Sequence, residues 1–155
     1  MNFILLSVLG LGPVEFLIVI IFVVALAMIP KVFYLLTLQK AMEQVDFERR
    51  VMPKGQVWLE LIPLFNMVWQ FFNVNNVTKS LENEFHFRGM ASQEITSAAT
   101  LGKTFCILSC CSLIPLVGGL AGLGSFVCWI IFWIKISNFK KQLEDYQLHK
   151  IEYIK

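Results

Sequence analysis

The sequence predicts an all-α integral membrane protein, a helical bundle with three to four membrane segments. Hydrophobic residues make up 57% of the 155 residues and charged residues only 15%, whereas a soluble domain is typically about 45–50% apolar and about 25% charged. Long uncharged runs alternate with short charged stretches, and polar residues within one of these runs recur at helical spacing. At this length, residues 1–155 are expected to form a single membrane domain.

The first membrane segment is expected at residues 14–38. Pro13 suits the first turn of a helix, and Glu15 in that turn favours the positive end of the helix dipole. The apolar run that follows exceeds the roughly 20 residues needed to span a bilayer. Pro30 is expected to kink this helix rather than end it, because the apolar pattern continues beyond it. No Lys or Arg precedes the apolar residues 3–12, so no cleavable export signal is expected.

The second segment, expected at residues 57–77, is broken by Pro63. Two interpretations remain open. Either the helix spans the membrane with a proline kink, or the chain enters, turns at Pro63 and returns, which requires protein or water to cover the non-helical backbone. Glu60, about one helical turn before the proline, is an ionisable residue near the bilayer, and such residues are functional candidates. A position at the membrane surface is the simpler interpretation of Glu60.

The third and fourth segments are expected at residues 99–116 and 119–138. No charged residue lies between Lys103 and Lys135, and one straight helix over that run would exceed the roughly 30 Å hydrocarbon core. A proline and several glycines near the middle predict a tight hairpin there. Small residues that allow close helix pairing follow the turn, and these candidate packing residues are Gly118, Gly119, Gly122 and Gly124.

Amide side chains recur at helical spacing after Pro63. The spacing places the polar series on one helix face, and its members are Asn66, Gln70, Asn73, Asn76, Ser80 and Asn83. Two roles remain open for the first four. They could join this helix to a second copy or to a membrane partner, with roughly 0.6–2 kcal/mol per contact. Alternatively they line a water-filled pore, which requires an oligomer because one chain encloses too little space.

No catalytic or metal-binding set is evident. The four cysteines lie within apolar runs without a Cys-x-x-Cys pair, and the two histidines are distant in sequence, so neither a metal nor another cofactor is expected. Residues 97–104 resemble a phosphate-binding loop, but Ser97 stands in place of the first glycine and no strand precedes it. The formal net charge of +2 gives no indication of a nucleic-acid partner.

The distribution of positive residues favours the re-entrant arrangement. If the segment at Pro63 returns to the side it came from, all 13 Lys and Arg residues fall on one side of the membrane. Four spans would divide them between the two sides, which the positive-inside rule disfavours. We therefore expect an outside N-terminus, a cytoplasmic C-terminus, and cytoplasmic polar parts at residues 39–56, 78–97 and 140–155.

Several short motifs resemble a group of small bacterial multi-pass membrane proteins. These motifs are Ile62-Pro-Leu-Phe-Asn66, Trp69-Gln-Phe71, Ser80-Leu-Glu82, Leu101-Gly-Lys103, Ile114-Pro115, Cys128-Trp-Ile130 and Trp133-Ile-Lys135. The resemblance extends over residues 35–143. It implies a bacterial inner (plasma) membrane location and carries no known activity, so it assigns no functional residue.

The expected function is that of a non-enzymatic inner-membrane protein. It would self-associate or dock a membrane partner through the helix striped with Asn and Gln. An oligomeric pore or channel lined by the same stripe is the alternative, and a membrane enzyme is a distant third. The expected partners are the lipid bilayer and either further copies of the chain or another membrane protein.

Overall fold

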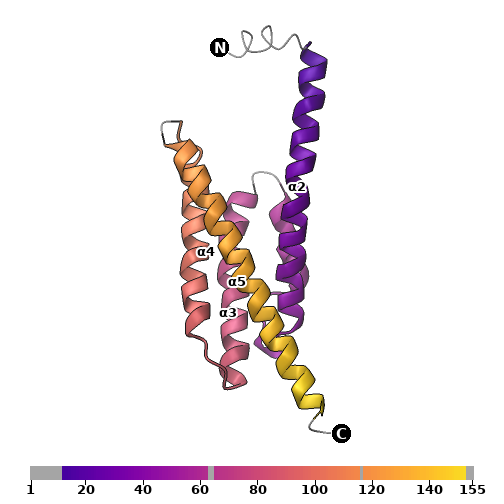
Figure 1. Cartoon of the computed structure of the whole chain (residues 1–155), viewed down its shortest axis with the longest axis vertical. Helices are drawn as coiled ribbons and strands as arrows, with labels where there is room; N and C mark the ends of the chain where they lie inside the picture. The colour runs from indigo at the N-terminus through magenta and orange to yellow at the C-terminus, as the bar shows by residue number, and fades with distance from the viewer. Residues whose placement is uncertain (1–11, 63–64, 116, 153–155) are drawn as a thin grey trace. The chain divides into compact units, whose positions relative to one another are not determined.

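The computed structural model describes residues 12–62, 65–115 and 117–152, and all regular structure within these ranges is helical. This confirms the all-α class. The chain divides into two compact units, Met1–Tyr34 and Leu35–Lys155, each considered by itself below. The described helices are α2 (Pro13–Glu43), the 3-10 helices η1 (Phe47–Arg49) and η2 (Lys54–Leu61), α3 (Asn66–Phe87), α4 (Gln93–Cys111) and α5 (Gly118–Glu152) (Figure 1).

The described part of the first unit is the beginning of α2. Its most apolar stretch has a mean hydropathy of 2.8, and none of that stretch is buried inside the protein. Pro30 lies within α2, which continues as helix to Glu43, beyond the expected end at residue 38. α2 and the Gly118–Lys150 part of α5 are both long and apolar enough to cross a membrane. Of the residues 3–12 considered in the sequence, residues 3–11 lie outside the described ranges.

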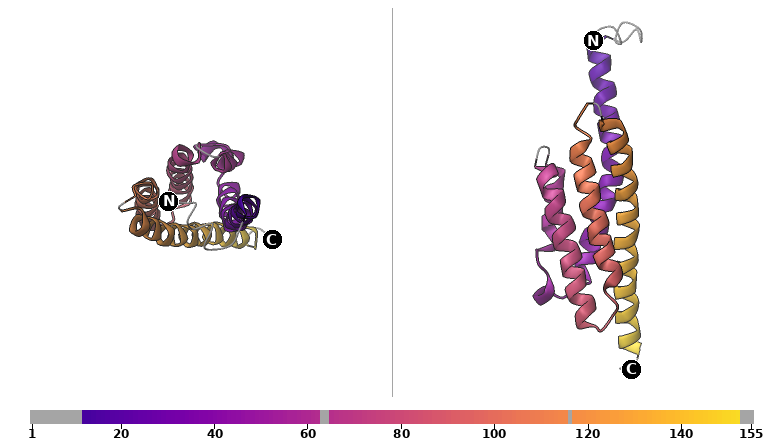
Figure 2. Two further views of the ribbon diagram at one scale, coloured as in Figure 1. Left: turned by 90° about the horizontal axis from the view of Figure 1, so that it is seen from above. Right: turned by 90° about the vertical axis from the view of Figure 1, so that its left-hand side faces the viewer.

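In the second unit, α4 packs against both α3 and α5 (Figure 2). At Gly102, side chains of both α3 and α5 pack against the backbone of α4. A Cβ atom at this position would lie 2.5 Å from Cγ1 of Val74 in α3 and 2.9 Å from the ring of Phe132 in α5. A larger residue at position 102 would therefore force the side chains of Val74 and Phe132 to move. The sequence analysis did not single out this glycine.

The described part of the turn between α4 and α5 consists of residues 112–115 and 117. The amide of Gly118 donates a hydrogen bond to the carbonyl of Ile114 at 2.7 Å. A Cβ atom on Gly118 would collide with the carbonyl oxygen of Ser112, so the turn requires glycine there. Gly124 lies against Leu108 of α4 and Gly122 against Ser112 of the turn, whereas nothing within 4 Å would meet a Cβ atom on Gly119 among the described residues.

The helices do not share the bounds of the expected membrane segments, which were assigned from hydrophobicity. The stretch 57–77 is not one helix: η2 covers Lys54–Leu61 and α3 begins at Asn66, while the turn expected at Pro63 lies outside the described residues. α3 also continues ten residues past 77 and stops at Gly89, whose φ of 67° suits glycine. α5 continues past 138 into the polar tail. α3 and α5 therefore continue as helix from the expected membrane segments into the polar parts expected at residues 78–97 and 140–155.

Candidate functional site: the buried amides and an arginine–glutamate cluster

η2 lies alongside the first turns of α3, so the chain doubles back on itself there. The indole nitrogen of Trp69 donates a hydrogen bond to the carbonyl of Gln56 at 2.7 Å. The amide nitrogen of Asn73 donates to the carbonyl of Val57 at 3.1 Å and to the carboxylate of Glu60 at 2.5 Å. These bonds join residues on both sides of the turn.

The polar row of α3 faces inward, toward the chain's own preceding segment. Asn73 is fully buried, and Gln70 and Glu60 are 4% and 2% exposed. About two turns further along α3, the backbone amide of Val51 donates to Oγ of Ser80 at 2.9 Å. Asn73, Ser80 and Asn83 therefore hold residues 49–61 against α3, and Gln70 and Asn73 are both buried within the one chain.

The other two amides named from the sequence are less enclosed. Asn66 and Asn76 are half-buried, and the amide nitrogen of Asn76 contacts the sulfur of Met52 at 3.8 Å. Contact with a second chain, or with water in a pore, is thus open to these two residues and not to Gln70 and Asn73. Within the described part of the chain, Nε2 of Gln70 and Oδ1 of Asn73 have no hydrogen-bond partner.

We expect Asn73→Leu to lower the free energy of unfolding by about 1–3 kcal/mol, because it removes two buried hydrogen bonds. Thermal or denaturant unfolding in detergent measures the effect. Asn75→Leu is the matched control, since Asn75 lies on the same helix with its side chain exposed. Equal stability of the two variants would contradict an internal role for the amide row.

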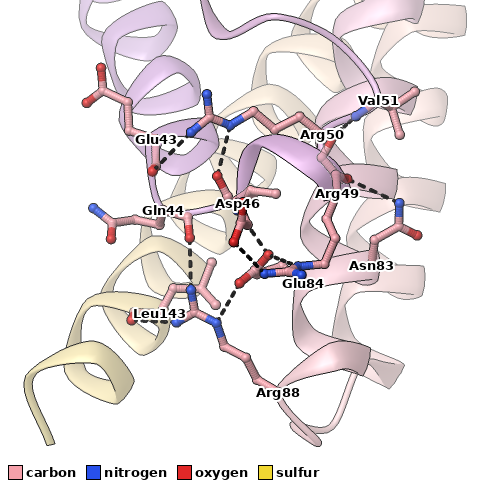
Figure 3. Close-up of polar contacts among 12 residues, drawn as sticks. Glu43, Gln44, Asp46, Arg49, Arg50, Val51, Asn83, Glu84, Arg88 and Leu143 are labelled. Atoms are coloured by element: carbon pink, nitrogen blue, oxygen red, sulfur yellow. Dashed lines mark hydrogen bonds and ion pairs between the residues drawn. The ribbon is translucent and has the colours of Figure 1, made fainter. Parts of the chain in front are cut away.

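A second polar cluster lies near the end of α3, around the carboxylate of Glu84 (Figure 3). Glu84 is 1% exposed. One carboxylate oxygen accepts hydrogen bonds from Nε of Arg49 at 2.7 Å and from the backbone amide of Asp46 at 3.0 Å. The other accepts from Nε of Arg88 at 2.7 Å. A single buried carboxylate thus binds two guanidinium groups.

Arg88 extends this cluster to two further parts of the second unit. Its two terminal nitrogens donate to the carbonyl of Leu143 in α5 at 3.2 Å and to the carbonyl of Gln44, directly after α2, at 3.0 Å. Arg49 also bonds Asp46 at 2.9 Å, and its guanidinium lies 3.8 Å from the centre of the Phe87 ring. The cluster therefore ties the segment after α2 to α3 and α5.

The charge state of Glu84 follows from competing effects. Burial raises the pKa of this carboxyl group, but the hydrogen bonds from Arg49, the Asp46 amide and Arg88 outweigh burial, so the net pKa lies below its ordinary value of 4.5. Glu84 is therefore ionised at neutral pH. The partly open cavity of about 530 Å³ beside the cluster is lined by these arginines together with Arg50, Tyr146 and Lys150.

The arrangement supplies ion pairs and charge-assisted hydrogen bonds. Glu84, Arg49 and Arg88 are already bonded to one another or to backbone carbonyls. Among the described residues no group of His, Cys, Asp and Glu is arranged to hold a metal ion. The stretch that resembles a phosphate-binding loop lies within α4, with no strand before it in the described part of the chain.

No family model, curated protein or solved structure matches this chain. The candidate sites of this chain follow from its own residues and their contacts. The sequence analysis missed the cluster around Glu84, although one signal was present: Glu84 and Arg88 are four residues apart on a helix, the spacing of an ion pair. The contribution of Arg49, distant in sequence, had no such local signal.

Proposed function

We propose that this chain is a non-enzymatic integral membrane protein whose second segment re-enters the membrane and whose charged parts share one side. One observation carries the proposal. Residues before and after the 57–77 stretch bind each other directly: Val51 bonds Ser80 at 2.9 Å, and the Arg49 carbonyl accepts from Asn83 at 3.3 Å. A stretch whose two flanks meet at one end of the bundle enters and leaves on one side.

Exposed apolar side chains in the second unit support membrane immersion of one end. α3, α4 and α5 are antiparallel neighbours joined by short loops, so the start of α3, the end of α4 and the start of α5 lie at the same end. Large exposed apolar residues gather there, where acyl chains would cover them. They are Phe65, Val68, Phe72, Ile107, Leu113, Ile114, Val117, Leu120, Leu123, Phe126, Val127, Ile131 and Ile134.

Trp133 and Lys135 of α5 lie at the level of the proposed membrane surface on this unit. Trp133 of α5 donates to the hydroxyl of Thr37 at 2.9 Å, and Lys135 nearby bonds the hydroxyl of Ser97 at 3.1 Å. Tryptophan and lysine are common at the lipid–water interface, where an apolar body and a polar end are both satisfied. From this level, α5 residues 118–134 rise about 25 Å toward the hairpin, which approaches the roughly 30 Å hydrocarbon thickness.

Orientation and location follow as parts of the same proposal. With α2 as one span, the hairpin of α4 and α5 as two and the second segment re-entrant, all 13 Lys and Arg residues lie on one side. The positive-inside rule makes that side cytoplasmic, with the C-terminus on it. The resemblance to small bacterial multi-pass proteins favours a bacterial inner membrane.

The proposed role is association within that membrane, with a second copy or with another membrane protein. Asn76 and the lipid-facing helix surfaces are available for such contacts. A pore lined by the whole amide row has less support, because Gln70 and Asn73 are buried in the chain's own core. The buried side chain of Asn73 instead forms its hydrogen bonds inside the chain, with residues of the proposed re-entrant segment.

Two measurements on the full chain test this proposal. We expect the protein to stay in the membrane pellet after an alkaline carbonate wash, which strips peripheral proteins. In nanodiscs, light scattering should give a mass above that of one chain, or a defined membrane protein should co-purify in fixed ratio. Release by carbonate would refute the membrane assignment. A strict monomer without a stoichiometric partner would refute association.

A further inference from the structure

A groove between α3 and α4 carries a second, smaller cavity, which has no part in the clusters described above. Its volume is about 210 Å³. Two lysines, Lys79 of α3 and Lys103 of α4, line it from opposite sides. Asn75 and Thr96 also line it, and both side chains are exposed, so they add an amide and a hydroxyl donor. These groups suit an anionic oxygen-rich ligand.

The charges of the groove leave one positive charge uncompensated. Glu82, which also lines the cavity, pairs with Lys79 at 3.0 Å. Within the described part of the chain, Lys103 has no ion-pair partner and its side chain is exposed. The net charge of the lining is therefore positive by one, which matches the single negative charge of a phosphodiester.

Apolar residues continue the groove toward the hairpin end on both helices. Phe72 lies seven residues before Lys79, so both occupy one face of α3, and Phe72 is 49% exposed. Ile107 lies one turn beyond Lys103 on α4 and is 55% exposed. A ligand that fits both parts has a charged oxygen-rich head and an apolar chain.

The polar part of the groove lies at the level of the proposed membrane surface. Gly102, next to Lys103, packs against Phe132 of α5, and Phe132 adjoins the interfacial Trp133. Lys103 is thus near the depth at which lipid phosphate groups lie, with Phe72 and Ile107 on the acyl-chain side. Basic pockets between helices at this depth bind anionic headgroups in membrane proteins.

We propose that the groove binds an anionic phospholipid, with its phosphate between Lys79 and Lys103 and one acyl chain along Phe72 and Ile107. This inference rests on the proposed membrane insertion. It also gives a role to Lys103, the lysine of the stretch that resembles a phosphate-binding loop. The phosphate would come from the surrounding bilayer and not from a nucleotide.

The test uses the full chain in nanodiscs of phosphatidylcholine, with or without phosphatidylglycerol. We expect wild-type protein to retain phosphatidylglycerol in native mass spectrometry and to unfold at a higher temperature when it is present. Lys79→Gln with Lys103→Gln should lose that stabilisation and retain the lipid roughly fivefold less per lysine removed, the usual attraction of one lysine to an anionic membrane. Lys141→Gln, an exposed lysine of α5 outside the groove, is the matched control.

Each other outcome overturns the inference in a distinguishable way. Equal retention by the double variant and wild type, or equal loss in Lys141→Gln, would refute the groove as the site. Stabilisation in detergent by inorganic phosphate alone, to the same extent, would indicate a site for a free anion. Failure of the wild-type chain to enter nanodiscs would refute the proposed function as well, whereas normal entry without lipid preference refutes only this inference.

Discussion

Replacing Glu84 with glutamine is expected to lower the free energy of unfolding by about 3–5 kcal/mol, the usual cost of removing one partner from a buried ion pair. The carboxylate accepts hydrogen bonds from Arg49 and Arg88 and is 1% exposed. Without its charge, the two guanidinium groups would face each other across a neutral amide. Denaturant unfolding in a neutral detergent, followed by circular dichroism, measures the loss.

The control for this variant is Glu82→Gln on the same helix. Glu82 pairs with Lys79 at the surface, where 39% of the glutamate side chain is exposed, and such pairs contribute at most about 1 kcal/mol. A similar loss of stability in both variants would contradict the central place of Glu84 in the cluster.

The same carboxylate predicts a pH dependence. Because the pKa of Glu84 is lower in the folded protein than its ordinary value of 4.5, its stabilisation is fully present above pH 4.5. It is lost as the pH falls below that value, through the folded pKa. Wild-type protein should therefore lose stability on acidification in this range, and Glu84→Gln should lose less. Identical pH profiles would show that other carboxylates govern acid unfolding.

Helix content and the hairpin could be read from the sequence because their signals are local. Uncharged apolar runs indicate the helices, and the glycine at position 118 fits a turn that no larger residue could adopt. Gly89 ends α3 for a similar local reason, its φ of 67°. Hydrophobicity falls at residues 77 and 138, but α3 and α5 continue there as helices, because a change from apolar to polar residues does not by itself end a helix.

The partner of the amide row could not be read from the sequence. Spacing shows that Gln70 and Asn73 share a face, but the same spacing fits a second chain, a pore or the chain's own backbone. The choice among these partners depends on the position of η2, because the carbonyl of Val57 in η2 accepts a hydrogen bond from Asn73 at 3.1 Å. A short 3-10 segment has no clear periodic signal. The ion pair of Arg49 and Glu84 could not be read from the sequence either, because the two residues are 35 apart and only the folded chain brings them together.

Both flanks of the 57–77 stretch are expected to lie on the same side of the membrane. Thiol labelling of each flank tests this placement directly, because a position is either reached by the reagent or protected from it. Single cysteines at Glu48 and at His86, both exposed positions, would be introduced in a chain whose four native cysteines are replaced by serine. Labelling uses a thiol reagent that does not cross membranes, applied to intact bacterial cells and again after permeabilisation. A cysteine at position 2 serves as the control for the proposed outside N-terminus.

We expect positions 48 and 86 both to be protected in intact cells and both to be labelled once the membrane is permeabilised. Position 2 should be labelled from outside in intact cells. Protection of both follows from the bonds between residues 49–51 and 80–84, which hold the flanks together. Labelling of position 48 in intact cells with continued protection of position 86 would mean that the 57–77 stretch crosses the bilayer, and it would contradict the re-entrant fold.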